Sequence, residues 1–118
     1  MSFQNALAGV AVRNLGSAER WYETLLGRRA DSKPMPEVAE WRFARGGWIQ
    51  VFHDERRAGS SSVTLAVDDL DETLARLSGQ GVEIKSKNVS KVVKTAILSD
   101  PDGNQIVLAQ ALTGDIAH

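Results

Sequence analysis

The feature that most constrains the fold is an internal repeat. The segments NALAGVAVRNLGSAERWYETLLG and SSVTLAVDDLDETLARLSGQG align so that Val12 to Leu15 fall on Val67 to Leu70, a spacing of 55 residues in a chain of 118. Self-similarity at a spacing of this size is typical of one supersecondary unit used more than once. The sequence therefore predicts two copies of the same structural unit.

Each copy begins with a short apolar strand that leads into a helix. The alternating apolar residues are Ala8, Val10 and Val12 in the first copy and Val63, Leu65 and Val67 in the second. In the first copy these residues alternate with Leu7, Gly9 and Ala11, so both faces of the strand are largely apolar. Two apolar faces are typical of a strand that is buried on both sides. Asn14 and Asp69 then stand in the position of helix N-caps, and Glu72 follows Asp69 at the spacing of a capping box. Both strands are therefore expected to be followed by helices.

Apolar residues at helical spacing support the two helices and mark their ends. They are Leu15, Ala18, Tyr22, Leu25 and Leu26 in the first copy and Leu70, Leu74 and Leu77 in the second. Gly27 and Gly81 stand where a helix commonly ends in a left-handed residue. We interpret these stripes as the surfaces that pack on a sheet.

The rest of each copy predicts further strands. VAEWRFARGGWIQVF contains two β-rich runs joined by Gly46-Gly47, a dipeptide typical of a tight hairpin turn. VEIKSK, KVVKTAILS and QIVLAQ are three more candidate strands, and Asp100 to Asn104 turn the chain between the last two. Residues 31–36 are expected to form a loop, and residues 54–62 the connection between the copies. The sequence predicts one α+β domain over residues 1–118, with module one at about 5–54, module two at about 61–111 and a tail at 112–118.

Composition narrows the possible functions. The apolar fraction of 42% and the charged fraction of 25% are ordinary for a globular protein, and no window reaches the ~18 apolar residues of a membrane span. A net charge of −1 gives no field that would attract nucleic acid or an anionic membrane. The lack of cysteine excludes a disulfide framework and thiolate chemistry. We expect a cytoplasmic protein with no nucleic-acid and no membrane partner.

Several motifs together resemble the vicinal oxygen chelate superfamily. They are the paired modules, the WYETLLG that ends the first helix and the DPDGNQIVL that begins at Asp100. This superfamily includes glyoxalase I, the extradiol dioxygenases, methylmalonyl-CoA epimerase and the bleomycin-resistance proteins. The resemblance implies two tandem βαβββ modules that form a curved mixed sheet around a concave pocket. It also implies a homodimer, because two subunits complete the sites in many members of this length.

The metal enzymes of this superfamily take histidine, glutamate or glutamine ligands from strands of both modules. The resemblance places these ligand positions at or near Leu7, Gln50, Ser62 and Val107. Only the amide oxygen of Gln50 could bind a metal there, and weakly, whereas a divalent site generally needs three or more protein ligands. We therefore expect no metal and no cofactor. Without the ion, the glyoxalase, epimerase and dioxygenase reactions lose their electrophile.

The two histidines do not restore a site. His53 ends a predicted strand, and we interpret it as a surface or edge residue. His118 is the last residue, and we interpret it as a spectator. Asp54 and Glu55 follow His53 directly, but consecutive side chains on a strand point to opposite faces. No catalytic residue is therefore assigned.

The predicted hairpin carries a candidate binding wall. A tight turn at Gly46-Gly47 pairs Trp48 with Arg45, Gln50 with Phe43, and Phe52 with Trp41 on one face. Aromatic rings can stack on planar or cationic ligands, but they can equally fill a core or a subunit interface. A register error of one residue would exchange the two faces. The predicted ligand-binding residues are Trp41, Phe43, Trp48, Gln50, Phe52, Ser62, Thr64 and Val107.

These observations favour a metal-free, glyoxalase-like and bleomycin-resistance-like protein that binds a small aromatic or apolar organic ligand for sequestration or resistance. The near-neutral charge and Arg45 beside the pocket argue against bleomycin itself. One alternative is a lyase, isomerase or dioxygenase-type enzyme with an unrecognised active site. A second alternative is a regulatory or interaction domain with a vestigial pocket.

Overall fold

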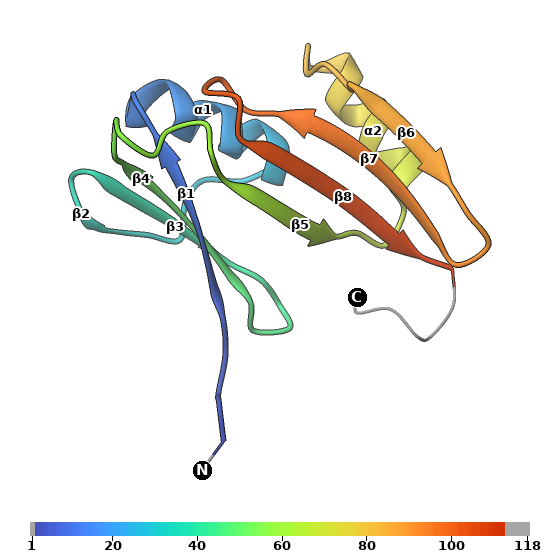
Figure 1. Cartoon of the computed structure of the whole chain (residues 1–118), viewed down its shortest axis with the longest axis horizontal. Helices are drawn as coiled ribbons and strands as arrows, with labels where there is room; N and C mark the ends of the chain where they lie inside the picture. The colour runs from blue at the N-terminus through green and yellow to red at the C-terminus, as the bar shows by residue number, and fades with distance from the viewer. Residues whose placement is uncertain (1, 113–118) are drawn as a thin grey trace.

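The fold consists of two four-stranded sheets side by side, each with one helix on one face, in a computed structural model that describes residues 2–112 (Figure 1). The strands are β1 Leu7–Val12, β2 Ser32–Met35, β3 Val38–Arg42, β4 Trp48–His53, β5 Ser62–Ala66, β6 Ser86–Val89, β7 Val93–Ser99 and β8 Gln105–Ala111, and the helices are α1 Leu15–Leu26 and α2 Leu70–Gly79. The first sheet has the order β1-β4-β3-β2 and the second the order β5-β8-β7-β6. The predicted repeat and the α+β class are confirmed.

Both sheets are mixed and are built in the same way. The first strand of each runs parallel to the last, β1 to β4 and β5 to β8, and the remaining pairs are antiparallel. A parallel pair needs a long crossover connection, and the helix of each module lies within that connection. This is the reason why each copy reads strand, helix and then strands.

The predicted helix ends are present. Asn14 Oδ1 accepts a hydrogen bond from the Ser17 N–H at 3.0 Å, and Asp69 Oδ1 accepts one from the Glu72 N–H at 3.0 Å. Such N-caps satisfy backbone donors that have no partner inside the helix. Gly27 ends α1 with a φ of 77°, in the left-handed region that glycine adopts without a steric penalty.

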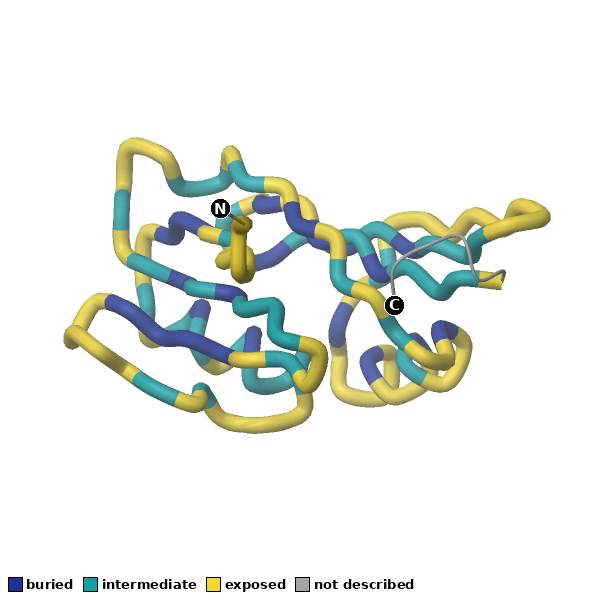
Figure 2. The backbone as a smooth tube through the Cα atoms, turned by 90° about the horizontal axis from the view of Figure 1, so that it is seen from below, coloured by how far each residue is buried: buried dark blue, intermediate teal, exposed yellow. Residues whose placement is uncertain are grey.

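Each helix covers one face of its sheet and leaves the other face open. α1 contacts β3 and β4, and α2 contacts β7 and β8. On β4, Ile49 and Val51 are buried on the helix side, whereas Trp48, Gln50 and Phe52 on the other side are half-buried. Figure 2 shows buried positions along the strands and helices and exposed positions on the connecting loops. The helix-free side of β1, β4 and β3 is called the open face of the first sheet below.

The turn at residues 100–104 joins the two modules. Asn104 is fully buried, and its Nδ2 donates to the carbonyl of Ala11 on β1 at 2.8 Å. The Ser61 N–H, just before β5, donates to Asn104 Oδ1 at 2.8 Å. The DPDGN motif therefore has a structural role, because its asparagine links the first strands of both modules.

Two sequence predictions of local structure need correction. Residues 31–36, expected to be a loop, contain strand β2, and Pro34 is tolerated there because β2 is the edge strand of its sheet. The strand expected over VEIKSK begins only at Ser86, and Val82 belongs to the buried core instead of the strand. Neither helix in residues 2–112 is long and apolar enough to cross a membrane.

Candidate functional site

The hairpin between β3 and β4 has a different register from the predicted one. Trp48 pairs with Arg42 instead of Arg45, and Gln50 pairs with Glu40 instead of Phe43. The turn is a longer loop over residues 43–47, in which the Phe43 N–H donates to the Gly47 carbonyl at 2.8 Å. The shift is three residues. Because side chains alternate along a strand, an odd shift exchanges the two faces of β3.

The corrected register places Trp41 in the core. Its side chain is fully buried on the helix face beside Ile49. The ring centroid lies 6.2 Å from that of Tyr22 on α1, and Trp41 Nε1 donates to the Arg28 carbonyl at 3.0 Å. The prediction that Trp41 belongs to the binding wall is therefore wrong, because its ring packs between the sheet and α1.

The same shift brings Glu40 to the open face, where sequence reasoning did not place it. Glu40 is only 8% exposed, and both of its carboxylate oxygens accept hydrogen bonds. Ser32 Oγ donates to Oε1 at 3.0 Å, and Gln50 Nε2 donates to Oε2 at 2.7 Å. The sequence signal that could have indicated this position is the single glutamate among the apolar residues of VAEWR. A buried carboxylate is retained only when hydrogen bonds compensate for its lost hydration.

Two aromatic rings on the open face lie under arginine side chains. The Arg42 guanidinium carbon lies 4.4 Å from the centroid of the Trp48 ring, and that of Arg57 lies 5.3 Å from the Phe52 ring. These are cation–π distances. Gln50 lies between Trp48 and Phe52 on β4. Its polar amide is therefore flanked by two aromatic rings, each of which is stacked with an arginine.

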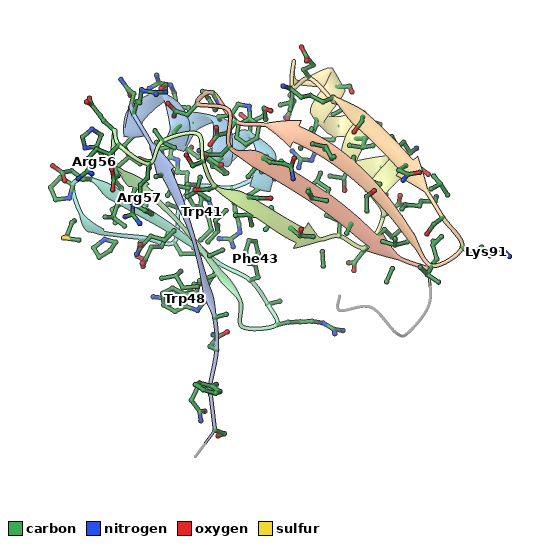
Figure 3. The ribbon with its side chains drawn as sticks, viewed as in Figure 1. Trp41, Phe43, Trp48, Arg56, Arg57 and Lys91 are labelled. Atoms are coloured by element: carbon green, nitrogen blue, oxygen red, sulfur yellow. The ribbon has the colours of Figure 1, made fainter. Side chains whose placement is uncertain are left out.

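A cavity of about 560 Å³ opens between the β3–β4 hairpin and β5. It is lined by Ala6, Ala8, Phe43, Ala44, Arg45, Gly47, Trp48, Val63, Thr64, Leu65, Ala66 and Asp68. Figure 3 shows Phe43 in the space between the hairpin and β5. Three of the predicted residues, Phe43, Trp48 and Thr64, thus come together from both modules.

The other predicted residues lie outside the lining of this cavity. Gln50 and Phe52 continue from Trp48 along the open face. Val107 on β8 pairs with Thr64, and Ser62 lies two residues before Thr64, so these three share the helix-free face of the second sheet. Ser62 Oγ accepts a hydrogen bond from Gln105 Nε2 at 3.2 Å. The predicted set therefore lies on two sheet faces that flank the cavity.

The residues at the superfamily's ligand positions do not fit a divalent metal. Leu7, Ser62 and Val107 offer no carboxylate, imidazole or thiolate, and the Gln50 amide is engaged by Glu40. Within residues 2–112, no group of three or more histidine, cysteine, aspartate or glutamate side chains could hold a metal ion. His53 is 41% exposed, with Nε2 3.9 Å from Glu55 Oε1, and His118 lies outside the described residues.

Comparisons with known proteins agree with this architecture. A sequence model of the Glyoxalase/Bleomycin resistance protein/Dioxygenase superfamily matches residues 5–108. No curated protein sequence matches the chain. The glyoxalase/bleomycin resistance protein of Catenulispora acidiphila DSM 44928 is 33% identical, with a TM-score of 0.85 over 92% of this chain and 98% of that one.

Two proteins of Streptomyces sp. CB03234 share the fold. One is a glyoxalase/bleomycin resistance protein that is 25% identical, with a TM-score of 0.75 over 91% of this chain and 100% of that one. The other is TnmS3, an antibiotic binding protein that is 24% identical, with a TM-score of 0.81 over 94% of this chain and 98% of that one. On the sequence match and the 33% identity, this chain belongs to the glyoxalase/bleomycin resistance protein/dioxygenase superfamily.

Proposed function

We propose that the protein binds a small organic molecule with an aromatic or apolar surface, and that it holds this molecule without converting it. The observation that carries the proposal is the cavity of about 560 Å³ in which Phe43 and Trp48 of the hairpin meet Thr64 of β5. Its volume is within the range of about 300–1,000 Å³ typical of small-molecule sites. Two aromatic rings with few polar groups suit a ligand that is held mainly by stacking and burial.

Sequestration or resistance is the role that fits this binding. TnmS3, which shares the fold, is an antibiotic binding protein. The family also contains enzymes, so a lyase, isomerase or dioxygenase-type activity is the second candidate. Binding without conversion is favoured because the donor positions on β1, β5 and β8 carry Leu7, Ser62 and Val107, which do not fit a metal centre.

Metal independence has a direct test. The protein should be purified without chelator and its metal content measured by mass spectrometry. We expect substoichiometric zinc, nickel, iron and manganese, and the same ligand affinity before and after dialysis against chelator. One equivalent of any of these metals would support the enzymatic alternative instead.

We also propose that two copies pair through the start of β1 and the segment before it, which leaves the open face around Gln50 accessible. Leu7 at the edge of the first sheet is 47% exposed, and Phe3 in the preceding segment is 95% exposed. Exposed apolar side chains next to an open sheet face are typical of an association surface. Sedimentation velocity should show a dimer that weakens in a Leu7→Lys variant, whereas a monomer at all concentrations would contradict this part of the proposal.

Tryptophan emission tests ligand binding itself. Trp48 lines the cavity, whereas Trp21 lies on α1 with its ring 4.9 Å from that of Tyr22. A panel of small aromatic compounds should contain members that quench the emission of the wild-type protein. The quenching should be lost in a Trp48→Phe variant and kept in Trp21→Phe. No response from a diverse panel, or equal quenching in both variants, would favour an interaction domain with a vestigial pocket.

A further inference from the structure

We propose that the open face of the first sheet selects a planar aromatic anion that also carries an N–H or O–H donor, and that Glu40 is the positioning residue for this selection. The inference rests on the proposed function and specifies the part of the ligand that extends from the cavity onto the open face, past Trp48, which belongs to both. It is carried by two neighbouring cross-strand pairs, Glu40 with Gln50 and Arg42 with Trp48.

Glu40 determines how the amide of Gln50 is turned. Gln50 Nε2 donates to Glu40 Oε2 at 2.7 Å, and Ser32 Oγ occupies the other carboxylate oxygen at 3.0 Å. An ionised carboxylate only accepts hydrogen bonds, so the amide must turn its NH₂ group toward it. Gln50 Oε1 is therefore directed away from Glu40, and it has no hydrogen-bond partner within residues 2–112. Gln50 Oε1 can therefore accept a hydrogen bond from an N–H or O–H group of a ligand.

The space over the strand beside Gln50 is partly filled by the ring of Phe52. Gly9 on β1 pairs with Gln50 and has no side chain to cover the amide. A Cβ at Gly9 would lie 3.3 Å from Phe52 Cε1, which is already a tight contact. Leu7, on the same face of β1, is 47% exposed. A planar ligand can therefore stack on the Phe52 ring, beside the exposed Leu7 side chain, and reach the amide oxygen from there.

Arg42 supplies the positive charge. Its guanidinium lies over the Trp48 ring and forms no ion pair within residues 2–112, and the nearby Asp31 carboxylate accepts a hydrogen bond from the Arg42 backbone N–H at 2.6 Å. Arg57 differs, because its Nε is paired with Asp54 Oδ2 at 2.9 Å. A stacked guanidinium keeps its N–H edges available for a carboxylate or a sulfonate.

The spacing of the two groups defines the ligand further. Arg42 follows Glu40 by two residues on β3, and two residues along a strand span roughly 7 Å. The hydrogen-bond donor and the anionic group of the ligand should be separated by a similar distance. The Glu40 carboxylate competes less for the ligand's donor than Gln50 Oε1 does, because it is only 8% exposed and each of its oxygens already accepts one hydrogen bond.

A set of three fluorescent probes tests this selection. The first is 6-anilinonaphthalene-2-sulfonate, which has an N–H and a sulfonate at opposite ends of a naphthalene ring system. Its N-methyl derivative lacks the donor, and N-phenyl-2-naphthylamine lacks the sulfonate. In fluorescence titrations of the full chain, the first probe should bind more tightly than either of the others by about ten-fold.

Variants assign each preference to a residue. Gln50→Leu and Glu40→Met should abolish the preference over the N-methyl probe, whereas Arg42→Gln should abolish only the preference over the naphthylamine. Glu40→Gln should retain the donor preference, because an amide oxygen can still accept from Gln50 Nε2. The readout is a ratio of two affinities in the same variant, so a general loss of stability does not imitate it.

Three outcomes would overturn the inference. Equal affinity of the wild-type protein for all three probes would overturn it and leave small-molecule binding intact. If none of the three probes binds while other compounds quench the emission of Trp48, the inference is also overturned and small-molecule binding is again left intact. If probe binding decreases as the protein dimerises in sedimentation experiments, the open face is covered by a second copy, and the proposed ligand selection is wrong.

Discussion

Tyr22 and Asp100 are joined by a buried hydrogen bond across 78 residues of sequence, with Tyr22 Oη 2.8 Å from Asp100 Oδ2. The other hydrogen bonds of this carboxylate come from its own turn, where Asn104 Nδ2 donates to Oδ2 at 2.7 Å and the N–H groups of Asp102 and Asn104 donate to Oδ1. Tyr22 lies on α1 of the first module, and Asp100 directly follows β7 of the second. The phenol therefore links the two modules through the motif that identifies the family.

Replacement of Tyr22 by phenylalanine should destabilise the protein by about 1–3 kcal/mol. The variant keeps the aromatic ring but lacks the hydroxyl group, so the buried Asp100 carboxylate loses one of its hydrogen-bond donors. Urea unfolding of Tyr22→Phe, Asp100→Asn and the double variant should give non-additive losses. Additive losses would show that the two residues are not coupled.

The pH dependence of stability gives a second test of this bond. Burial and then the charge of Asp100 raise the pKa of Tyr22 far above its usual range. A group with a raised folded-state pKa contributes stability below its unfolded pKa and loses it as the pH rises above that value, which is about 10 for tyrosine. The free energy of unfolding should therefore fall above about pH 10 more steeply in the wild-type protein than in Tyr22→Phe. Equal slopes would contradict the assignment.

Two tryptophans on opposite faces of the first sheet should respond differently to truncation. Trp41 is fully buried against α1, so Trp41→Ala should lower the free energy of unfolding by about 3–5 kcal/mol. Trp48 is half-buried on the open face, so Trp48→Ala should cost clearly less stability and should abolish ligand-induced quenching. Similar losses of stability in both variants would contradict the register of the β3–β4 hairpin.

A pair of glycines tests the contact between the connecting loop and the 100–104 turn. Gly59 has a φ of +87°, and a Cβ there would lie 2.6 Å from the Asp102 carbonyl oxygen. Gly81 has a φ of +83° with nothing within 4 Å of the added carbon. Gly81→Ala should cost about 1 kcal/mol, the penalty of a left-handed alanine. Gly59→Ala should lower the thermal midpoint considerably more, and equal shifts would argue against the close contact.

Asp71 should titrate at unusually low pH. Hydrogen bonds from Lys87 on β6 and then from Lys94 on β7 lower the pKa of this carboxyl at the start of α2 to about 2. Carboxyl-carbon NMR titration should show this value in the wild-type protein and a higher one in Lys87→Gln and Lys94→Gln. Because the pKa is depressed, any stability from these pairs is present above the unfolded pKa and is lost as the pH falls toward 2. A normal pKa in all three proteins would contradict the pairing.

The local structure could be predicted from the sequence because its signals are local. The helix caps at Asn14 and Asp69, the left-handed Gly27 and the alternation in β1 and β5 are each set by residues a few positions apart. The repeat at 55 residues and the DPDGN motif then predicted the family and the two modules. One local prediction was wrong. Pro34 indicated a loop, but the segment forms strand β2, because an edge strand tolerates proline.

The residues on the open face of the first sheet depended on information that the sequence does not carry locally. Gly46-Gly47 is compatible with a two-residue turn, yet the chain closes a longer loop over residues 43–47, and the resulting three-residue shift moves Trp41 into the core and Glu40 to the open face. The period of side chains on a strand is two, so loop length alone decides which of two alternating sets is exposed. The sequence by itself therefore determined the two modules and their helices. Only the tertiary structure decided which side chains lie on the open face and that Asp100 meets Tyr22, because both depend on contacts between segments far apart in the chain.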